Sequence, residues 1–164
     1  ALGAEFPALD HELARPDVTL TLLGEGNAGL TDELKALAAR RKLGDRVRLL
    51  GFQANPYPYI AAADAVVLPS RSEGFPNIVL EALALQRPVV ATPVPGMSSF
   101  LQDVPGSSVA TEITPEALSS AMAAALQHRG QTPCVDQVER FAAPNVAAQY
   151  ADAFERVLGG RCAG

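Results

Sequence analysis

Residues 65–92 read Ala-Val-Val-Leu-Pro-Ser-Arg-Ser-Glu-Gly-Phe-Pro-Asn-Ile-Val-Leu-Glu-Ala-Leu-Ala-Leu-Gln-Arg-Pro-Val-Val-Ala-Thr, and this stretch decides the fold class. Its two ends, Ala65–Leu68 and Pro88–Thr92, are short apolar runs rich in β-branched residues, typical of strands that are covered on both faces. Between them, Pro76–Leu85 is almost entirely apolar and predicts a buried helix. A strand, a helix and a second strand of these lengths form a right-handed unit of a parallel sheet.

The same alternation of strands and helices continues on both sides of this stretch. Further strands are predicted at Val18–Leu23, Val47–Leu50 and Ser108–Thr111. Further helices are predicted at Leu30–Leu43, Tyr57–Ala63, Pro115–His128, Val135–Phe141 and Asn145–Leu158. This order is typical of a doubly wound, Rossmann-like α/β fold with a parallel sheet. It predicts a single domain over residues 1–164, with a helical tail over residues 129–164.

Residues at the expected helix ends support these boundaries. Thr31 or Asp32 is the expected N-cap of the helix that follows the first strand, and Gly44 is expected to end that helix. Thr114 is the expected N-cap of the helix over 115–128, where a proline occupies the first helical position. In the tail we expect a break between helices near Pro144.

Composition and charge exclude several classes of protein. Apolar residues make up 48% of the 164 residues and charged residues 19%, as in an ordinary globular domain. The formal net charge is −5 and no basic stripe occurs, which argues against nucleic acid as a partner. No apolar segment reaches the ~20 residues of a membrane-spanning helix. The two cysteines and two histidines lack metal-ligand spacing, so no metal site is expected.

Glycine-containing turns follow the first four predicted strands, where the ligands of open parallel sheets bind. These turns contain Gly24 and Gly26, Gly51, Gly74, and Gly96. Glycine lets a backbone come close to a ligand, and the amino ends of the following helices offer free N–H groups to an anion. A single glycine in a turn is ordinary, but four such turns at one edge of a sheet favour a ligand-binding crevice.

The turn after Ala65–Leu68 carries the most specific chemistry. Glu73 precedes the apolar helix, and Glu81 is the only charge within Phe75–Leu85. A buried carboxylate needs hydrogen-bond donors, from the protein or from the hydroxyls of a ligand. Pro76 is expected to open the helix, which leaves the amides near Phe75 to Ile78 free to face a phosphate. Alternatively, Glu81 accepts hydrogen bonds from a neighbouring loop and Glu73 is merely solvated.

These residues resemble the carboxyl-terminal, nucleotide-sugar-binding domain of the retaining, GT-B-fold glycosyltransferases of family four. The family's signature is a pair of glutamates separated by seven residues, here Glu73 and Glu81 within Ser70–Ala84, followed by Arg87–Thr92. The resemblance covers about residues 15–128. Its other stretches are Leu22–Gly26, Asp45–Phe52, Ala61–Ser70 and Asp103–Gly106.

The resemblance implies a transferase that moves a hexosyl group from a nucleoside diphosphate sugar to an acceptor glycan or lipid, with the anomeric configuration retained. It implies that Glu73 is the catalytic-site carboxylate, in contact with hydroxyls of the donor sugar, and that Glu81 accepts hydrogen bonds from the ribose hydroxyls. Further donor contacts are implied for Gly74, Phe75, Pro76, Asn77, Ile78, Gly24, Gly26, Gly51 and Phe52. No metal and no cofactor is implied, and the donor is expected to carry UDP rather than GDP.

Parts of the family's pattern are absent from this sequence. Family members begin this domain with a strand that ends in Gly-Arg, followed by a Lys-Gly pair, and the Arg and Lys hold the diphosphate. That strand lies between the counterparts of Val18–Leu23 and Ala65–Leu68, so we expect a gap or a substitute there. The amino-terminal GT-B domain, which carries the acceptor site, is absent as well. We therefore expect an inactive part of a longer cytoplasmic enzyme, one that is peripheral to the inner face of the membrane.

Two other functions fit part of the sequence. A degenerate, non-catalytic binding or regulatory domain of the same fold would explain the lost Arg and Lys, whereas Glu73 and Glu81 favour chemistry. A nicotinamide-binding domain fits Gly24–Gly29, which reads G-x-G-x-x-G. That fingerprint also requires an acidic residue after the next strand, where this sequence has Gly51-Phe52-Gln53.

Overall fold

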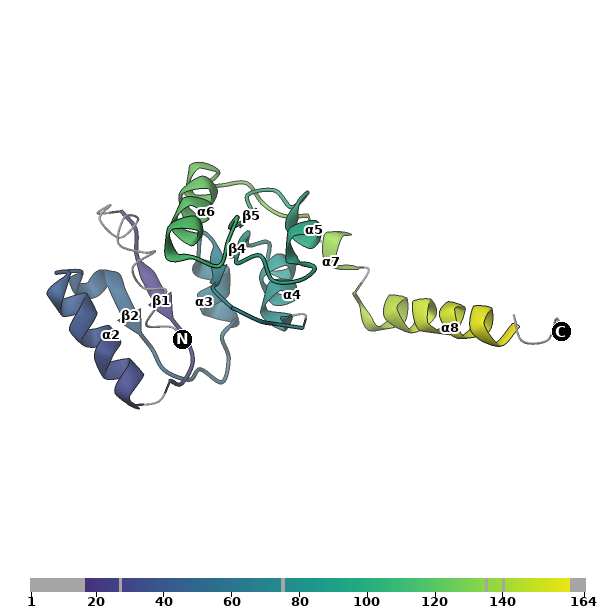
Figure 1. The fold of residues 1–164 in the computed structure, drawn as a ribbon, viewed down its shortest axis with the longest axis horizontal. Helices are drawn as coiled ribbons and strands as arrows, with labels where there is room; N and C mark the ends of the chain where they lie inside the picture. The colour runs from purple at the N-terminus through teal and green to yellow at the C-terminus, as the bar shows by residue number, and fades with distance from the viewer. Residues whose placement is uncertain (1–16, 27, 75, 135, 140, 160–164) are drawn as a thin grey trace.

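The computed structural model describes residues 17–26, 28–74, 76–134, 136–139 and 141–159. Short parallel strands alternate with helices, and the α/β class predicted from the sequence is confirmed (Figure 1). The strands are β1 (Leu20–Leu22), β2 (Val47–Leu49), β3 (Val66–Leu68), β4 (Val89–Ala91) and β5 (Ser108–Val109). The helices are α2 (Ala28–Arg40), η3 (Gly44–Arg46), α3 (Tyr57–Ala62), α4 (Asn77–Ala84), α5 (Met97–Leu101), α6 (Pro115–Gln127), α7 (Asp136–Glu139) and α8 (Ala143–Gly159).

The strands form two parallel sheets rather than one. One sheet has the order β1-β2, with Leu20 opposite Val47, and the other has the order β3-β4-β5, with Val67 opposite Val90. Within the described residues β1 and β3 do not pair with each other. The expected gap in the sheet is therefore present between β1 and β3.

One arginine links the starts of the two sheets. Arg129 Nη1 lies 3.1 Å from Asp17 Oδ2, and Arg129 Nη2 lies 4.0 Å from Asp64 Oδ2. Asp17 lies shortly before β1 and Asp64 shortly before β3, so the two strands begin at the same edge of the domain. The groups are partly exposed, and such ion pairs contribute little to stability.

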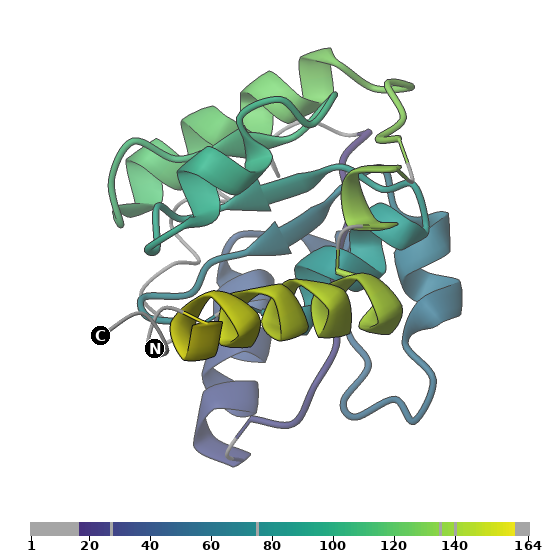
Figure 2. The same cartoon turned by 90° about the vertical axis from the view of Figure 1, so that its right-hand side faces the viewer.

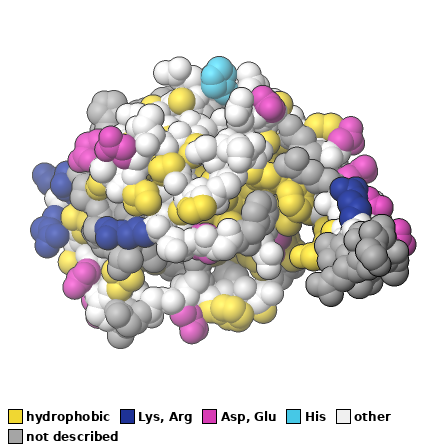
Figure 3. Space-filling model, turned by 45° about the vertical axis from the view of Figure 1, so that its right-hand side comes forward, with side chains coloured by type: hydrophobic (Ala, Val, Ile, Leu, Met, Phe, Trp, Pro, Cys, Tyr) yellow, Lys and Arg dark blue, Asp and Glu magenta, His cyan; other side chains and the backbone are white. Residues whose placement is uncertain are grey.

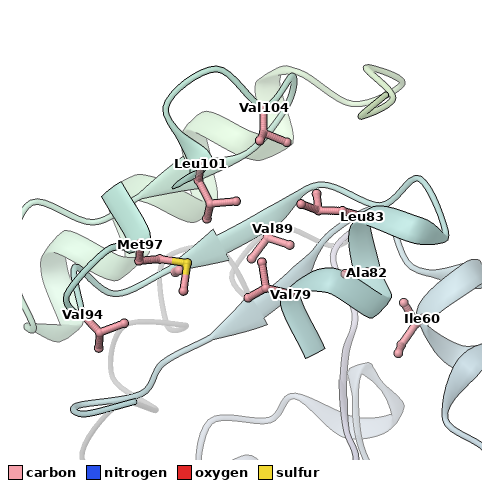
Figure 4. Close-up of a cluster of buried hydrophobic side chains, with 10 residues drawn as sticks. Ile60, Val79, Ala82, Leu83, Val89, Val94, Met97, Leu101 and Val104 are labelled. Atoms are coloured by element: carbon pink, nitrogen blue, oxygen red, sulfur yellow. The ribbon is translucent and has the colours of Figure 1, made fainter. Parts of the chain in front are cut away.

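Strand β4 divides the core into two clusters because alternate residues of a strand point to opposite faces. Val90 faces a cluster with Leu34 of α2 and Leu118 of α6. Val89 belongs to a second cluster on the other face, with Leu83 of α4 (Figure 4). The first cluster also contacts apolar residues of β1, β2 and β3, so it joins the two sheets. Figure 2 shows helices on both sides of the central strands, as expected for a doubly wound fold.

Strands β3 and β4 differ in burial. The three residues of β4 are at most 1% exposed, whereas those of β3 are all half-buried. Strand β4 has a neighbour on each side, but β3 pairs only with β4 within the described residues. The expectation that both strands are fully covered is therefore correct for β4 and wrong for β3.

The end of α2 differs from the sequence prediction. The helix begins at Ala28, so neither Thr31 nor Asp32 is its cap, and Lys42 takes the left-handed conformation that was expected for Gly44. The Lys42 amide donates to the Ala39 carbonyl and the Leu43 amide to the Ala38 carbonyl, the two bonds of a Schellman motif. Gly44, at φ 53°, instead begins the short helix η3.

Helix α4 ends in the same way. Gln86 has φ 57° and its amide donates to the Leu83 carbonyl, while the Arg87 amide donates to the Ala82 carbonyl. At the other end Pro76 is the N-cap rather than the first helical residue. The predicted boundary at Pro76 is thus wrong by one residue.

The other helices follow the predictions with one addition. Thr114 caps α6, since its hydroxyl accepts a hydrogen bond from the Ala117 amide at 3.3 Å. The five-residue helix α5 was not predicted, because its sequence is short and carries no cap signal. Helix α8 begins at Ala143 and includes Pro144 in its first turn, so the break between α7 and α8 lies before Ala143. Figure 1 shows α8 extending away from the sheets. Within the described residues no helix is long and apolar enough to cross a membrane.

Candidate functional site

The turns after β1 and β2 are joined through two of the predicted glycines. The Gly24 amide donates to the Gly51 carbonyl at 2.8 Å. Both residues have positive φ, 120° at Gly24 and 67° at Gly51, a conformation that residues with a side chain rarely adopt. An added Cβ would have open space at either position, so the conformation rather than crowding favours glycine there. The two turns thus form one rigid floor at the carboxyl ends of β1 and β2.

The loop after β3 holds Glu73 in a defined position. Ser70 Oγ donates to Glu73 Oε1 at 2.8 Å, which occupies one carboxylate oxygen on an exposed side chain. Thr92 anchors this loop; it is 2% exposed and lies just after β4. The Thr92 hydroxyl donates to the Ser70 carbonyl, and its amide donates to the Leu68 carbonyl at 3.1 Å. The core therefore positions Glu73 through Thr92 and Ser70.

Thr92 is a positioning residue whose role the sequence did not reveal. It closes the predicted strand Pro88–Thr92, and nothing in its spacing distinguishes it from other strand residues. A buried threonine at the carboxyl end of a strand must satisfy its hydroxyl. That requirement, together with the position next to a candidate loop, is the signal that could have identified it.

The amino end of α4 presents two backbone amides that precede its first helical hydrogen bond. Helical hydrogen bonding starts at Val79, whose amide donates to the Pro76 carbonyl at 3.1 Å, and no side chain caps the helix. The preceding amides, on Asn77 and Ile78, are first-turn donors of the kind that bind anions. Asn77 is exposed and Ile78 half-buried. Both residues lie within the range Phe75 to Ile78 for which an anion-accepting helix start is predicted from the sequence.

Glu81 lies on α4, about one turn after the helix start at Asn77. Its side chain is half-exposed rather than buried, which corrects the expectation of a carboxylate enclosed in the core. Helix α4 buries Val79, Ala82 and Leu83 on its core face, and Glu81 lies at the margin of that face. Within the described part of the chain its carboxylate makes no hydrogen bond or ion pair, so the alternative in which Glu81 caps a neighbouring loop finds no support there.

The other predicted site residues lie on the same carboxyl edge. Gly74 and Gly26 are exposed in the turns after β3 and β1, and Pro76 is buried. Phe52, which follows Gly51, is 66% exposed, a large apolar surface for a loop residue. Phe75 lies outside the described residues. Over the ranges that the structure describes, no cluster of His, Cys, Asp and Glu could hold a metal ion.

This arrangement can recognise a ligand that combines an anion with hydroxyl groups. Amides at a helix start bind phosphate oxygens, and carboxylates accept hydrogen bonds from hydroxyls. Residues 2–128 match the model of a protein family described as glycosyl transferases group 1. The chain belongs to the group 1 glycosyltransferases.

Known proteins similar to this group 1 glycosyltransferase chain include enzymes of sugar transfer. The alpha-D-kanosaminyltransferase of Streptomyces kanamyceticus is 33% identical over 82% of the chain and 34% of the relative. Sucrose-phosphate synthase from Thermosynechococcus elongatus has the same fold, with a TM-score of 0.74 and 21% identity over 98% of the chain and 44% of that structure. HepE of Anabaena, solved in complex with UDP-glucose, has a TM-score of 0.56 and 25% identity over 90% of the chain and 46% of that structure.

The chain spans only part of such proteins. It covers between 18% and 34% of the length of four curated relatives, and less than half of the two solved structures described above. The fold is that of the Rossmann-like GT-B glycosyltransferases. Membership of this family favours the transferase interpretation of Gly24–Gly29 over a nicotinamide-binding one.

Two hollows in the surface lie away from the carboxylates. One of about 510 Å³ lies between α5 and β5, and one of about 770 Å³ lies between α5 and α8. Neither is lined by Glu73 or Glu81.

Proposed function

We propose that this chain is the carboxyl-terminal, donor-binding half of a retaining GT-B glycosyltransferase, and that it binds a nucleoside diphosphate sugar at the carboxyl edge of its strands. The observation that carries the proposal is the junction of β3 and α4. There a carboxylate held by Ser70, two first-turn amides and a second carboxylate, which has no partner among the described residues, follow one another along a short stretch. A nucleotide sugar offers a diphosphate flanked by ribose and sugar hydroxyls, which is the matching set of groups.

In this proposal the two carboxylates have different tasks. Glu81 accepts hydrogen bonds from the ribose hydroxyls. Glu73 contacts hydroxyls of the donor sugar with the oxygen that Ser70 leaves unoccupied. The remaining predicted donor contacts are Gly74, Phe75, Pro76, Asn77 and Ile78 near the diphosphate and sugar, Gly51 and Phe52 at the base, and Gly24 and Gly26 on the floor.

The chemistry proposed for the amides is electrostatic. Transfer of the sugar leaves negative charge on the departing diphosphate, and the amides of Asn77 and Ile78 are fixed donors that stabilise such charge. Because the amides are held by α4, they need no reorganisation when the charge develops. No metal ion and no cofactor is part of the proposal.

Similarity to known enzymes supports the choice of ligand. The structure of HepE contains UDP-glucose, and that protein is 25% identical to this chain. We accordingly propose UDP rather than GDP as the nucleotide. The acceptor, a glycan or a lipid, and the second domain that would hold it belong to the part of the relatives that this chain does not span. The chain by itself is thus proposed to bind the donor without transferring the sugar, as part of a cytoplasmic enzyme at the inner face of the membrane.

Calorimetric titration of the chain with UDP and with GDP tests the proposal. We expect saturable binding of UDP, and binding weaker by about tenfold or more in Glu81→Ala, because a hydrogen bond to a charged acceptor is worth roughly 1.5–3 kcal/mol. Glu155→Ala, which removes an exposed carboxylate from α8, is the matched control and should bind as the unaltered chain does.

Two outcomes would contradict this proposal. If the folded chain binds neither nucleotide, a non-catalytic binding or regulatory domain of the same fold is the better description. If Glu81→Ala and Glu155→Ala bind UDP equally well, Glu81 does not hold the ribose. Retention of configuration requires a chain that also contains the acceptor domain, with the anomeric proton of the product followed by NMR.

A further inference from the structure

Positive charge is concentrated on one small part of an acidic protein. The net charge is −5, yet six of the 13 Lys and Arg lie between residues 35 and 48, where Asp45 is the only carboxylate. These cations are Lys35, Arg40, Arg41, Lys42, Arg46 and Arg48, and we call their surface the α2–β2 basic surface. Arg40, Arg41 and Lys42 are consecutive, and other residues separate the remaining three cations. Figure 3 shows most of the Lys and Arg side chains that are visible in this view at one end of the molecule, with Asp and Glu side chains near them.

The fold brings these cations together around the turn between α2 and β2. The Schellman motif at Lys42 reverses the chain, and the Arg46 amide donates to the Leu43 carbonyl in the turn that follows. Arg48 then folds back, with its Nε donating to the Asp45 carbonyl at 3.4 Å. Lys35 lies within α2 and Arg40 is its last residue, so both belong to the helix that leads into this turn.

Most of these side chains are exposed. Five of the six are exposed and Arg46 is half-buried. Arg41 and Arg46 also make interactions within the protein. Lys35, Arg40 and Lys42 form no ion pair with any carboxylate that the structure describes, so their charge is open to a partner.

Local structural roles account for only part of this charge. A cation in the last turn, such as Arg40, complements the dipole of α2. Arg48 places a charge on β2, which has one strand neighbour, and edge strands are commonly charged in this way. One cation is sufficient for each role, and Lys35 fulfils neither of them.

The position of this surface separates it from the proposed donor site. Arg46 immediately precedes β2, whereas Gly51 follows it, so the basic surface and the glycine floor lie at opposite ends of the same strand. A diphosphate bound near α4 cannot at the same time contact Lys42. The proposed donor site therefore does not account for this charge.

We propose that the α2–β2 basic surface docks the chain on an anionic lipid bilayer. Polybasic surfaces are attracted to anionic headgroups, and the attraction fades within a Debye length, about 8 Å at physiological salt. When the basic surface is in contact with the bilayer, acidic residues farther than this distance from the headgroups are screened from repulsion. A nucleic acid fits less well, because residues 35–48 contain no aromatic side chain on which bases could stack.

Co-sedimentation with vesicles tests the proposal on the 164-residue chain. We expect binding to vesicles of phosphatidylcholine with phosphatidylglycerol, none to phosphatidylcholine alone, and release at high salt. Each cation near an anionic surface raises the partition coefficient about fivefold, so Lys35→Gln with Arg40→Gln and Lys42→Gln should lower it about a hundredfold. The charge-preserving control, Lys35→Arg with Arg40→Lys and Lys42→Arg, should bind as before.

The glutamine variant also separates this proposal from the donor site. Its UDP titration and circular dichroism should match those of the unaltered chain, since the substitutions lie at the other end of β2. Equal binding to neutral and anionic vesicles, or full binding by the glutamine variant, would overturn the proposal. Binding to single-stranded DNA without binding to anionic vesicles would overturn it as well, in favour of a nucleic-acid surface.

Discussion

At the scale of single residues, two positions adopt a conformation that their side chains disfavour. Lys42 and Gln86 both have positive φ and end their helices in Schellman motifs, where glycine is the usual residue. A left-handed residue with a Cβ costs roughly 1–2 kcal/mol. The hydrogen bonds to the last carbonyls of α2 and α4 and the packing of the following residues outweigh that cost.

Gln86→Gly should stabilise the protein. Relief of the left-handed strain exceeds the entropy that glycine adds to the unfolded chain, for a net gain of about 1 kcal/mol and a rise in Tm of about 3 °C. The matched control is Ala84→Gly, on the helical side of the same motif, which should lower Tm by a similar amount. Thermal denaturation followed by circular dichroism measures both, and a lower Tm for Gln86→Gly would show that its side chain contributes more than the strain costs.

Thr92→Val should loosen the loop that carries Glu73. Valine keeps the shape but removes the hydroxyl donor, so the half-buried Ser70 loses that hydrogen bond, at a cost of about 1 kcal/mol. Thr92→Ser retains the donor and should preserve the proposed UDP affinity. Urea denaturation and UDP titration of the two variants check this. Equal UDP affinities would show that the hydrogen bond from Thr92 to Ser70 does not affect UDP binding.

At the scale of elements, helix α4 packs one face against the core, and its opposite side remains accessible at the candidate site. Val79, Ala82 and Leu83 are fully buried against β4 and α5, as Figure 4 shows for the labelled side chains. This packing fixes the direction of the helix and therefore the place of its first amides. A helix of eight residues is too short to be stable alone, so its position depends on that contact.

Leu83→Ala should destabilise the protein by about 2–5 kcal/mol, because it opens a cavity in a core site that is 0% exposed. Leu80→Ala, on the same helix but half-exposed, removes the same atoms and should cost clearly less. The midpoints of urea denaturation give both values. Equal costs would mean that α4 is not anchored through the face that Leu83 occupies.

At the scale of the whole molecule, a shared core holds together two sheets that do not pair. The cluster around Leu118 and Leu34 contacts β1 and β2 on one side and β4 on the other. Arg129 adds only an exposed ion-pair link between the strand starts. Side-chain packing rather than backbone hydrogen bonding thus makes one domain of the two sheets.

Leu118→Ala should therefore weaken both sheets together. Leu118 is 2% exposed, and its truncation should cost about 2–5 kcal/mol. In native-state hydrogen exchange, the amides of Leu22 in β1 and Val90 in β4 should lose protection by similar factors. Loss confined to one sheet would show that the sheets unfold independently.

Much of the site could be predicted because its signals are local. The turns after the strands, the amino end of α4 and the two glutamates all follow from the order of elements and the rule that parallel strands end at one edge. The half-exposed setting of Glu81 could not be predicted, since an apolar helix sequence does not show which neighbours are present to cover it. Thr92 was missed for the same reason, because its partner Ser70 lies 22 residues away.

The sequence by itself determined the elements, their order and the edge that carries the site, since hydrophobic periodicity and turn residues act over a few neighbouring positions. Only the tertiary structure decided that Gly24 and Gly51 share a hydrogen bond and that Thr92 anchors the loop that carries Glu73. These features depend on contacts between residues far apart in the chain. Their energies are set by which surfaces the folded chain brings together, and no local pattern encodes them.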